Sequence, residues 1–165
     1  MTLFRRVQLP SNATGQLLLH SMPGRKEPIT ECWDEIKRVP VHSIVSLTSD
    51  QEISAKSASY AQALAEGSVP CERRSLSVPD GGVPPDDIDL FDSASDVAEA
   101  LKAGQNVLVH CDGGVGRTGM FAAFVLMRLR LPLKEALLRV EAAGSRPETS
   151  AQSLFLKRMV ANTDG

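Results

Sequence analysis

Aromatic side chains are scarce in this chain of 165 residues, and its charge has no strong sign. Phe, Trp and Tyr together make up only 4% of the sequence, which is too few for a platform on which nucleic-acid bases stack. Lys and Arg number 18 and Asp and Glu number 20, so the formal net charge is -2. A dedicated nucleic-acid binder needs a basic surface, and we therefore expect no nucleic-acid partner.

Long apolar runs and paired cysteines are missing as well. No run approaches the roughly 18 apolar residues of a membrane span, and residues 1–10 lack the apolar core of a secretory signal. The three cysteines, Cys32, Cys71 and Cys111, are widely spaced, and this pattern predicts neither a disulfide framework nor a zinc cage. We therefore expect a cytoplasmic protein that binds no membrane and no metal.

The composition is that of an ordinary globular domain, with 42% hydrophobic and 23% charged residues. No repeat or linker divides the chain, so we expect residues 1–165 to form a single domain. Short apolar or β-branched runs predict strands over residues 16–20, 43–48, 71–78 and 106–110. Helical periods and end signals predict helices over residues 29–38, 54–66, 86–104, 118–129, 133–143 and 149–160. The alternation predicts an α/β fold with a mainly parallel central sheet flanked by helices.

Two of the predicted helices have informative apolar patterns. The helix over 118–129 is apolar on nearly every side, which is typical of a buried central helix. In the helix over 86–104, we expect the buried face to hold the apolar residues that follow the helical period, which are Ile88, Phe91, Ala94, Ala98 and Leu101.

A glycine-rich loop, residues 111–117, joins the strand over 106–110 to the central helix. Glycine permits the turns that let successive backbone N–H groups converge on one point. The N-terminus of the following helix attracts negative charge to the same place. Such a loop binds a tetrahedral anion such as phosphate. We expect the substrate contacts to come from Asp112, Gly113, Gly114, Val115, Gly116 and Arg117.

The two ends of the glycine-rich loop carry the reactive groups. Cys111 begins the loop, where the helix terminus and the guanidinium are expected to stabilise its thiolate form. Arg117 ends the loop with a planar fork that can hold two phosphate oxygens. A thiolate below a bound phosphoryl group is placed for in-line attack, which gives a phosphocysteine intermediate. Because Arg117, the backbone N–H groups and the helix stabilise the charge, we expect no metal and no other cofactor.

The residues His110, Cys111, Gly114, Arg117 and Thr118 match the motif His-Cys-x-x-Gly-x-x-Arg-Thr. In this motif the chain resembles the cysteine-based protein tyrosine phosphatases. It resembles in particular the compact dual-specificity-like phosphatases, a group that includes the cyclin-dependent-kinase-associated phosphatase and archaeal relatives. The resemblance covers most of the chain and implies hydrolysis of phosphotyrosine, and also of phosphoserine or phosphothreonine, in a phosphorylated protein or peptide. A phosphatase for a non-protein phosphate ester, or a phosphoprotein-binding module without turnover, remain alternatives.

The resemblance also implies an acid for the leaving oxygen and a residue that places water in the second step. The family acid is an Asp on an upstream loop, and Asp80, which precedes two glycines, matches it, although a plain turn has the same composition. Asp86 and Asp87 compete for this role but better fit a helix start. Gln152 matches the water-placing residue, although Thr149-x-x-Gln152 is equally a helix capping box.

Three residues are expected to support the loop. The resemblance implies that Thr118 donates its hydroxyl to the Cys111 sulfur, although a helix cap is an alternative. His110 is expected to fix the loop by hydrogen bonding to backbone near Cys111 rather than to act as a base, and a core histidine with satisfied hydrogen bonds is equally compatible. Glu52 resembles the acidic residue that supports the signature Arg in some relatives, and a solvated carboxylate at a helix start is equally compatible.

The remaining positions bear on substrate and partners. Phosphoinositide phosphatases usually carry lysine inside the loop, whereas here no basic residue lies between Cys111 and Arg117. Arg25 and Lys26 either flank the cleft or form a solvated pair. Cys71 either pairs with Cys111 on oxidation or is a buried strand residue. We expect the chain to act as a monomer.

Overall fold

The computed structural model describes residues 2–163, and its centre is one sheet of five strands. The strands lie in the order β1 (Arg5–Val7), β2 (Gln16–His20), β5 (Asn106–His110), β3 (Ser43–Ser46) and β4 (Glu72–Ser75). All neighbours pair in parallel except β1, which is antiparallel to β2. The predicted α/β class with a mainly parallel sheet is therefore confirmed.

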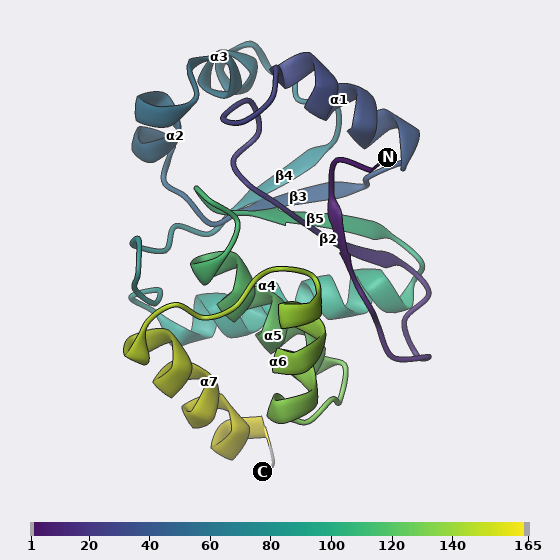
Figure 1. Cartoon of the computed structure of the whole chain (residues 1–165), viewed down its shortest axis with the longest axis vertical. Helices are drawn as coiled ribbons and strands as arrows, with labels where there is room; N and C mark the ends of the chain where they lie inside the picture. Colours follow the sequence, from purple (N-terminus) through teal and green to yellow (C-terminus); the bar gives the residue numbers. More distant parts are fainter. Residues whose placement is uncertain (1, 164–165) are drawn as a thin grey trace.

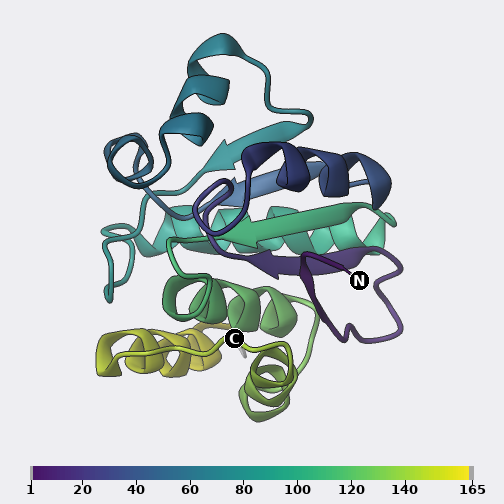
Figure 2. The ribbon, with the colours of Figure 1, turned by 45° about the horizontal axis from the view of Figure 1, so that its top comes forward.

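Helices cover both faces of the sheet (Figures 1 and 2). One face carries α1 (Ile29–Arg38), α2 (Asp50–Lys56) and α3 (Ala58–Glu66). The other face carries α4 (Asp87–Lys102), α5 (Gly116–Arg128), α6 (Leu133–Ala142) and α7 (Ser150–Thr163). Within residues 2–163, no helix has both the length and the apolar character needed to cross a membrane.

Side chains of the central strands alternate between two cores. Leu17 and Leu19 of β2 enter the larger core with α4 and α5, whereas Leu18 between them packs on the α1 side. β5 repeats the pattern, because successive side chains of a strand point to opposite faces. Because both faces of such a strand are buried, its sequence is an unbroken run of apolar residues. α5 is buried from Gly116 to Met127, so the predicted central helix is confirmed and begins two residues earlier than expected.

The carboxyl ends of three parallel strands meet at one edge of the sheet. His20, His110 and Ser46 are the last residues of β2, β5 and β3 and lie in register with one another. The glycine-rich loop follows β5, the segment that leads to α1 follows β2, and α2 follows β3 after a short link. Ligands of open α/β sheets bind at this carboxyl edge, so the fold brings these three segments to the expected place.

The predicted single helix over 54–66 is wrong, because the segment contains two helices, α2 and α3. The break lies at Ser57, which is buried and ties the chain to a distant segment. Its hydroxyl donates to the carbonyl oxygen of Pro23 over 2.8 Å and accepts the N–H of Tyr60 over 3.4 Å. A contact with a residue so far along the chain leaves no trace in a helical period.

The buried face of α4 also differs from the expectation. Ile88 is 67% exposed, whereas Leu90 and Val97 are buried together with Ala94, Ala98 and Leu101. Residues i and i+2 of an α-helix are separated by about 200° around its axis. Ile88 therefore points away from the face that Leu90 occupies. Asp86 caps the helix through the N–H of Ile88 at 2.8 Å, and this cap places Ile88 in the solvated first turn.

Candidate active site

The glycine-rich loop surrounds the sulfur of Cys111. This side chain is buried, and the N–H of Gly114 donates to its Sγ over 3.2 Å. α5 begins at Gly116, and Val115 before it makes no side-chain cap. The first N–H groups of a helix have no partner within the helix. The start of α5 therefore offers hydrogen-bond donors and positive potential to an anion in the loop.

Gly114 determines the curvature of the loop. Its φ is +76°, and a Cβ at this position would lie 2.6 Å from the carbonyl oxygen of His20. Only glycine meets both conditions without strain. The carbonyl oxygen of Gly114 accepts hydrogen bonds from Arg5 Nη2 and Ser145 Oγ, each over 2.6 Å. The loop is thus packed on the end of β2 and tied to β1 and to the segment before α7.

Arg117 is almost completely buried and is held by two other segments. Its Nη1 donates to Glu52 Oε1 over 2.8 Å and to the carbonyl oxygen of Val78 over 3.0 Å. Its Nη2 donates to Glu52 Oε2 over 2.8 Å. A guanidinium has five N–H donors, so one donor on Nη2 and the one on Nε remain for a ligand. These two lie side by side and suit two oxygens of one phosphate.

Glu52 reaches Arg117 from the start of α2. Ser49 caps this helix by accepting the N–H of Glu52 over 3.1 Å, which is the first half of a capping box. The Glu52 carboxylate does not reach back to the cap but binds Arg117, and Lys56 Nζ lies 3.2 Å away. The hydrogen bond from Arg117 is the main cause that lowers the pKa of Glu52. Of the two interpretations of Glu52, the structure shows support of Arg117.

Asp80 stands on a tight turn, residues 79–82, at the mouth of the loop. Its side chain is 81% exposed, and its Oδ1 lies 3.6 Å from Arg117 Nη2. Thr149 and Gln152 donate to the carbonyl oxygens of the two glycines after Asp80, over 2.8 and 3.2 Å. The turn is therefore tied to the start of α7, and its carboxylate stays open to a ligand.

The competing carboxylates lie at the start of α4. Asp86 is the helix cap described above. Asp87 Oδ2 lies 3.5 Å from Arg158 Nη2 of α7. Asp86 and Asp87 thus stabilise the start of α4 and its contact with α7. This is the structural role that the sequence predicted for them as the alternative to catalysis.

Gln152 is completely buried, and both ends of its amide have partners. Its Oε1 accepts the N–H of Glu148 over 2.8 Å, and its Nε2 makes the contact with Gly82. Its backbone N–H donates to Thr149 Oγ1 over 3.2 Å. One half of a capping box is thus present, with the side chain reaching Glu148 instead of Thr149. The role of Gln152 toward water stays a prediction.

His110 lies beneath the loop in a closed polar network. Its Nδ1–H donates to the carbonyl oxygen of Cys111 over 2.9 Å, so its Nε2 is an acceptor, and the hydroxyls of Ser46 and Tyr60 lie 2.7 and 2.9 Å from this nitrogen and 2.8 Å from each other. Arg73 Nε donates to Ser46 over 2.9 Å. Burial lowers the pKa of His110 to about 4. The imidazole is therefore neutral at physiological pH and holds the backbone at Cys111.

Thr118 and Cys71 make fewer contacts than the sequence suggested. Thr118 Oγ1 is buried and has no hydrogen-bond partner among residues 2–163, so neither a cap nor a bond to the Cys111 sulfur is formed. A buried hydroxyl of this kind can be satisfied by a ligand or a thiolate. Cys71 packs in the core on the α1 side, whereas Cys111 belongs to the core on the α5 side. Burial raises the pKa of the Cys71 thiol to about 11.

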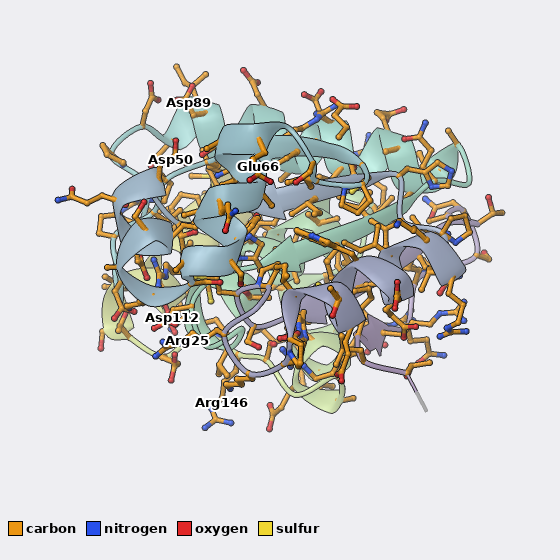
Figure 3. All side chains as sticks on the ribbon, turned by 90° about the horizontal axis from the view of Figure 1, so that it is seen from above. Arg25, Asp50, Glu66, Asp89, Asp112 and Arg146 are labelled. Atoms are coloured by element: carbon orange, nitrogen blue, oxygen red, sulfur yellow. The ribbon has the colours of Figure 1, made fainter. Side chains whose placement is uncertain are left out.

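Asp112 brings a negative charge into the loop, and two cations surround it. Lys56 Nζ lies 2.8 Å from its Oδ2, and Arg25 Nε lies 2.5 Å from its Oδ1. Figure 3 shows Arg25 and Asp112 next to each other, with Arg146 farther out. Arg25 therefore belongs to the edge of the site, as one of its two interpretations predicts. Lys26, the next residue, is exposed.

Sequence reasoning missed several residues that hold the site together. Arg5, Ser145 and Lys56 bind the loop, and Tyr60 joins the network of His110. Each of these partners lies at least 31 residues away from the group it binds. No local motif signals such contacts, and only the fold brings them together.

One protein family model matches residues 20–130 of the chain, and its description is polymorphic toxin system, DSP-PTPase phosphatase. The matched segment covers more than half of the chain. It contains the glycine-rich loop, Glu52 and Asp80. No curated protein is significantly similar to the chain.

Solved structures of phosphatases share the fold. Kinase associated phosphatase (KAP), with its catalytic-site cysteine replaced by serine, has a TM-score of 0.83 at 18% identity, and the match covers 100% of this chain and 98% of KAP. Tk-PTP in its active form has a TM-score of 0.69 at 29% identity, with 90% and 95% covered. PTPMT1 in complex with PI(5)P has a TM-score of 0.67 at 17% identity, with 98% and 99% covered.

We predict that Gly114→Ala destabilises the protein, because the positive φ and the contact with His20 both oppose a Cβ. The strain should lower the free energy of unfolding by about 1–3 kcal/mol. Gly113→Ala is the matched control, because a Cβ there meets nothing within 4 Å, and its effect should stay within about 0.5 kcal/mol. Denaturant unfolding measures both variants, and equal stabilities would contradict this account of the loop.

A second prediction concerns pH and His110. The pKa is about 4 in the folded protein and about 6.5 in the unfolded chain. Only the unfolded chain therefore gains a proton as the pH falls from about 6.5 to 4, and stability decreases by up to about 3 kcal/mol. Denaturant midpoints measured across this range should fall less steeply for His110→Gln than for the parent. Parallel curves would show that His110 titrates normally.

Proposed function

Since the chain belongs to the DSP-PTPase phosphatase family of polymorphic toxin systems, we propose that it hydrolyses phosphotyrosine in proteins through a phosphocysteine intermediate, with phosphoserine and phosphothreonine as further candidate substrates. The fork of Arg117 carries this proposal. Glu52 and Val78 occupy three of its N–H groups and leave two, next to each other, for phosphate oxygens. The cysteine at the start of the same loop supplies the nucleophile.

In the first step, the Cys111 thiolate attacks phosphorus, an S–P bond forms and the bond from phosphorus to the leaving oxygen breaks. Arg117, the loop N–H groups and the start of α5 stabilise the charge on the three equatorial oxygens. Asp80 donates a proton to the leaving oxygen. Its position supports this role, because the carboxylate is open and lies 3.6 Å from Arg117 Nη2.

In the second step, water attacks phosphorus, the S–P bond breaks and Cys111 leaves as a thiolate. Asp80, now a carboxylate, takes a proton from the water. Thr118, whose hydroxyl has no partner among the described residues, stabilises the departing sulfur. Gln152 is the candidate that places the water, and its amide reaches the Asp80 turn through Gly82. His110 keeps the backbone of Cys111 in position and takes no part in proton transfer.

The charges around the loop favour a single phosphate group as the substrate. The positions between Cys111 and Arg117 contain no lysine or arginine and include Asp112. The nearby cations Arg25 and Lys56 both contact Asp112, so a further phosphate would have to compete with this carboxylate for them. PTPMT1 is solved with PI(5)P, but these contacts favour a phosphorylated protein or peptide for this chain.

The proposal extends to the form and setting of the protein. Residues 1–165 constitute one phosphatase domain, which acts as a monomer in the cytoplasm. The three cysteines are free thiols, which supports a reducing compartment. The reaction uses no metal and no cofactor, because the groups named above supply the charge stabilisation.

We predict a preference for phosphotyrosine peptides over inositol polyphosphates and phosphoinositide vesicles. Each missing charge-assisted contact to a further phosphate is worth about 1.5–3 kcal/mol, so kcat/KM should differ by at least about tenfold. Phosphate release from all substrates is measured side by side, and phosphoserine and phosphothreonine peptides define the range of substrates.

Cys111→Ser should abolish turnover of every substrate, because no base activates the serine. Higher kcat/KM for the inositol compounds would overturn the substrate assignment, and an active Cys111→Ser would overturn the covalent mechanism.

The assignment of the acid is tested by Asp80→Asn. A tyrosine phenolate has a pKa of about 10 and needs a proton in the transition state, so kcat on phosphotyrosine should fall about 10²- to 10⁴-fold. The loss should shrink for aryl phosphates with more acidic leaving groups. Asp86→Asn is the matched control, because asparagine caps a helix as well as aspartate does. If Asp86→Asn showed a loss of kcat that depends on the leaving group and Asp80→Asn did not, Asp86 would be the general acid.

A further inference from the structure

Three buried side chains with metal-binding atoms meet on the α1 side of the sheet. His20 ends β2, Glu27 lies in the segment before α1, and Cys32 lies in the first turns of α1. Their donor atoms all lie within 4.8 Å of one another, and within residues 2–163 no other group of three His, Cys, Asp or Glu residues is so arranged. The proposed reaction uses none of the three side chains.

The cluster contains a polar atom without a partner. Glu27 Oε1 contacts His20 Nε2, and the side chains of Glu27 and His20 are only 6% and 10% exposed. Glu27 Oε2 is buried and has no hydrogen-bond partner among the described residues. A buried carboxylate oxygen without a partner is costly, and a cation at this point would satisfy it. Cys32, which is completely buried, brings its thiol to the same place.

The donor set identifies the class of cation. Calcium and magnesium take oxygen ligands, so a site with one nitrogen and one sulfur donor does not suit them. Imidazole, thiolate and carboxylate together are typical zinc ligands. We propose that His20, Glu27 and Cys32 form a zinc site, in which His20 Nε2, the Glu27 carboxylate and Cys32 Sγ are the protein ligands.

The spacing of the donor atoms is compatible with this ion. Tetrahedral zinc, with bonds of about 2.0 Å to nitrogen and oxygen and 2.3 Å to sulfur, holds its ligand atoms about 3.3–3.6 Å apart. The three donor atoms lie within 4.8 Å of one another. To bind zinc, the side chains would have to open the direct contact of His20 Nε2 with Glu27 Oε1 and bring Cys32 Sγ into the same range. His20 is slightly exposed, which gives the ion a path from solvent. Three protein ligands leave the fourth position to water, unlike the four protein ligands of most structural zinc sites.

The proposed site lies directly behind the glycine-rich loop. The carbonyl oxygen of His20 packs where a Cβ of Gly114 would lie. Two residues on, the N–H of Met22 donates to the carbonyl oxygen of Asp112 over 2.9 Å. Zinc would therefore fix the segment 20–32 that supports one side of the loop and carries Arg25. Its role is structural, and it takes no part in the phosphoryl transfer.

The test is zinc binding by the full chain in the Cys111→Ser background, which removes the reactive thiol as a competing ligand. One equivalent of Zn²⁺ should bind in a competition titration with a chromophoric chelator, and it should raise the Tm. Co²⁺ in place of zinc should give the intense visible bands of a tetrahedral site and the near-ultraviolet absorption of a cobalt–thiolate bond. Because this background is catalytically inactive, the outcome is independent of the proposed function.

Matched variants identify the ligands. Glu27→Gln and Cys32→Ser change one donor each with little change in volume, and each should weaken zinc binding by more than the roughly 10- to 100-fold that follows loss of an outer-shell partner. Cys71→Ser is the control, because Cys71 lies in the same core but outside the cluster, and it should keep one equivalent. Circular dichroism without metal verifies that each variant is folded. Absence of stoichiometric binding, unchanged affinity in both ligand variants, or equal loss in Cys71→Ser would overturn the proposal.

Discussion

The ion pair between Arg117 and Glu52 is the interaction on which the site depends. The Arg117 side chain is only 2% exposed, and a guanidinium removed from water is tolerated only when its N–H groups have partners. Glu52 at the start of α2 and the carbonyl of Val78 after β4 satisfy three of them. The pair therefore holds α2, the segment after β4 and α5 together at one edge of the sheet. The two remaining N–H groups have no hydrogen-bond partner among the described residues, and Asp80 Oδ1 lies 3.6 Å from one of their nitrogens. They are the groups to which we assign phosphate binding in the proposed reaction.

The glycine-rich loop presents N–H groups to a ligand because the surrounding protein binds its carbonyl groups. The Nδ1–H of His110 donates to the carbonyl oxygen of Cys111. The backbone N–H of Met22, in the segment after β2, donates to the carbonyl oxygen of Asp112. The side chains of Arg5 and Ser145 donate to the carbonyl oxygen of Gly114, and the backbone N–H of Arg146 donates to that of Val115. The carbonyl oxygens that accept these hydrogen bonds belong to Cys111, Asp112, Gly114 and Val115. With these acceptors bound by the surrounding protein, the N–H groups of the loop and of the start of α5 are left to attract an anion, and this attraction needs no lysine.

Local features of the sequence were sufficient to predict the class of fold, the loop and the family, which the family match confirms. The loop is contiguous, and its residue types follow directly from what an anion and a thiolate require. Contacts between distant segments could not be predicted in this way. β1 enters the sheet only through pairing with β2, and its two arginines give no strand pattern. The break at Ser57 depends on Pro23, and the cluster of His20, Glu27 and Cys32 has no recognisable ligand spacing.

The charges at the rim of the loop are the observation that supports a protein phosphomonoester, and not a polyphosphate, as the proposed substrate. Asp112 contacts both Arg25 and Lys56, so on one side of the loop a second phosphate would meet a carboxylate and compete with it for the two cations. On another side Asp80 is 81% exposed and tied to α7 through its turn. An additional phosphate there would meet a further negative charge. In the proposed reaction a single phosphate avoids both costs, because Arg117 and the loop N–H groups would receive its charge and only its leaving oxygen would approach Asp80.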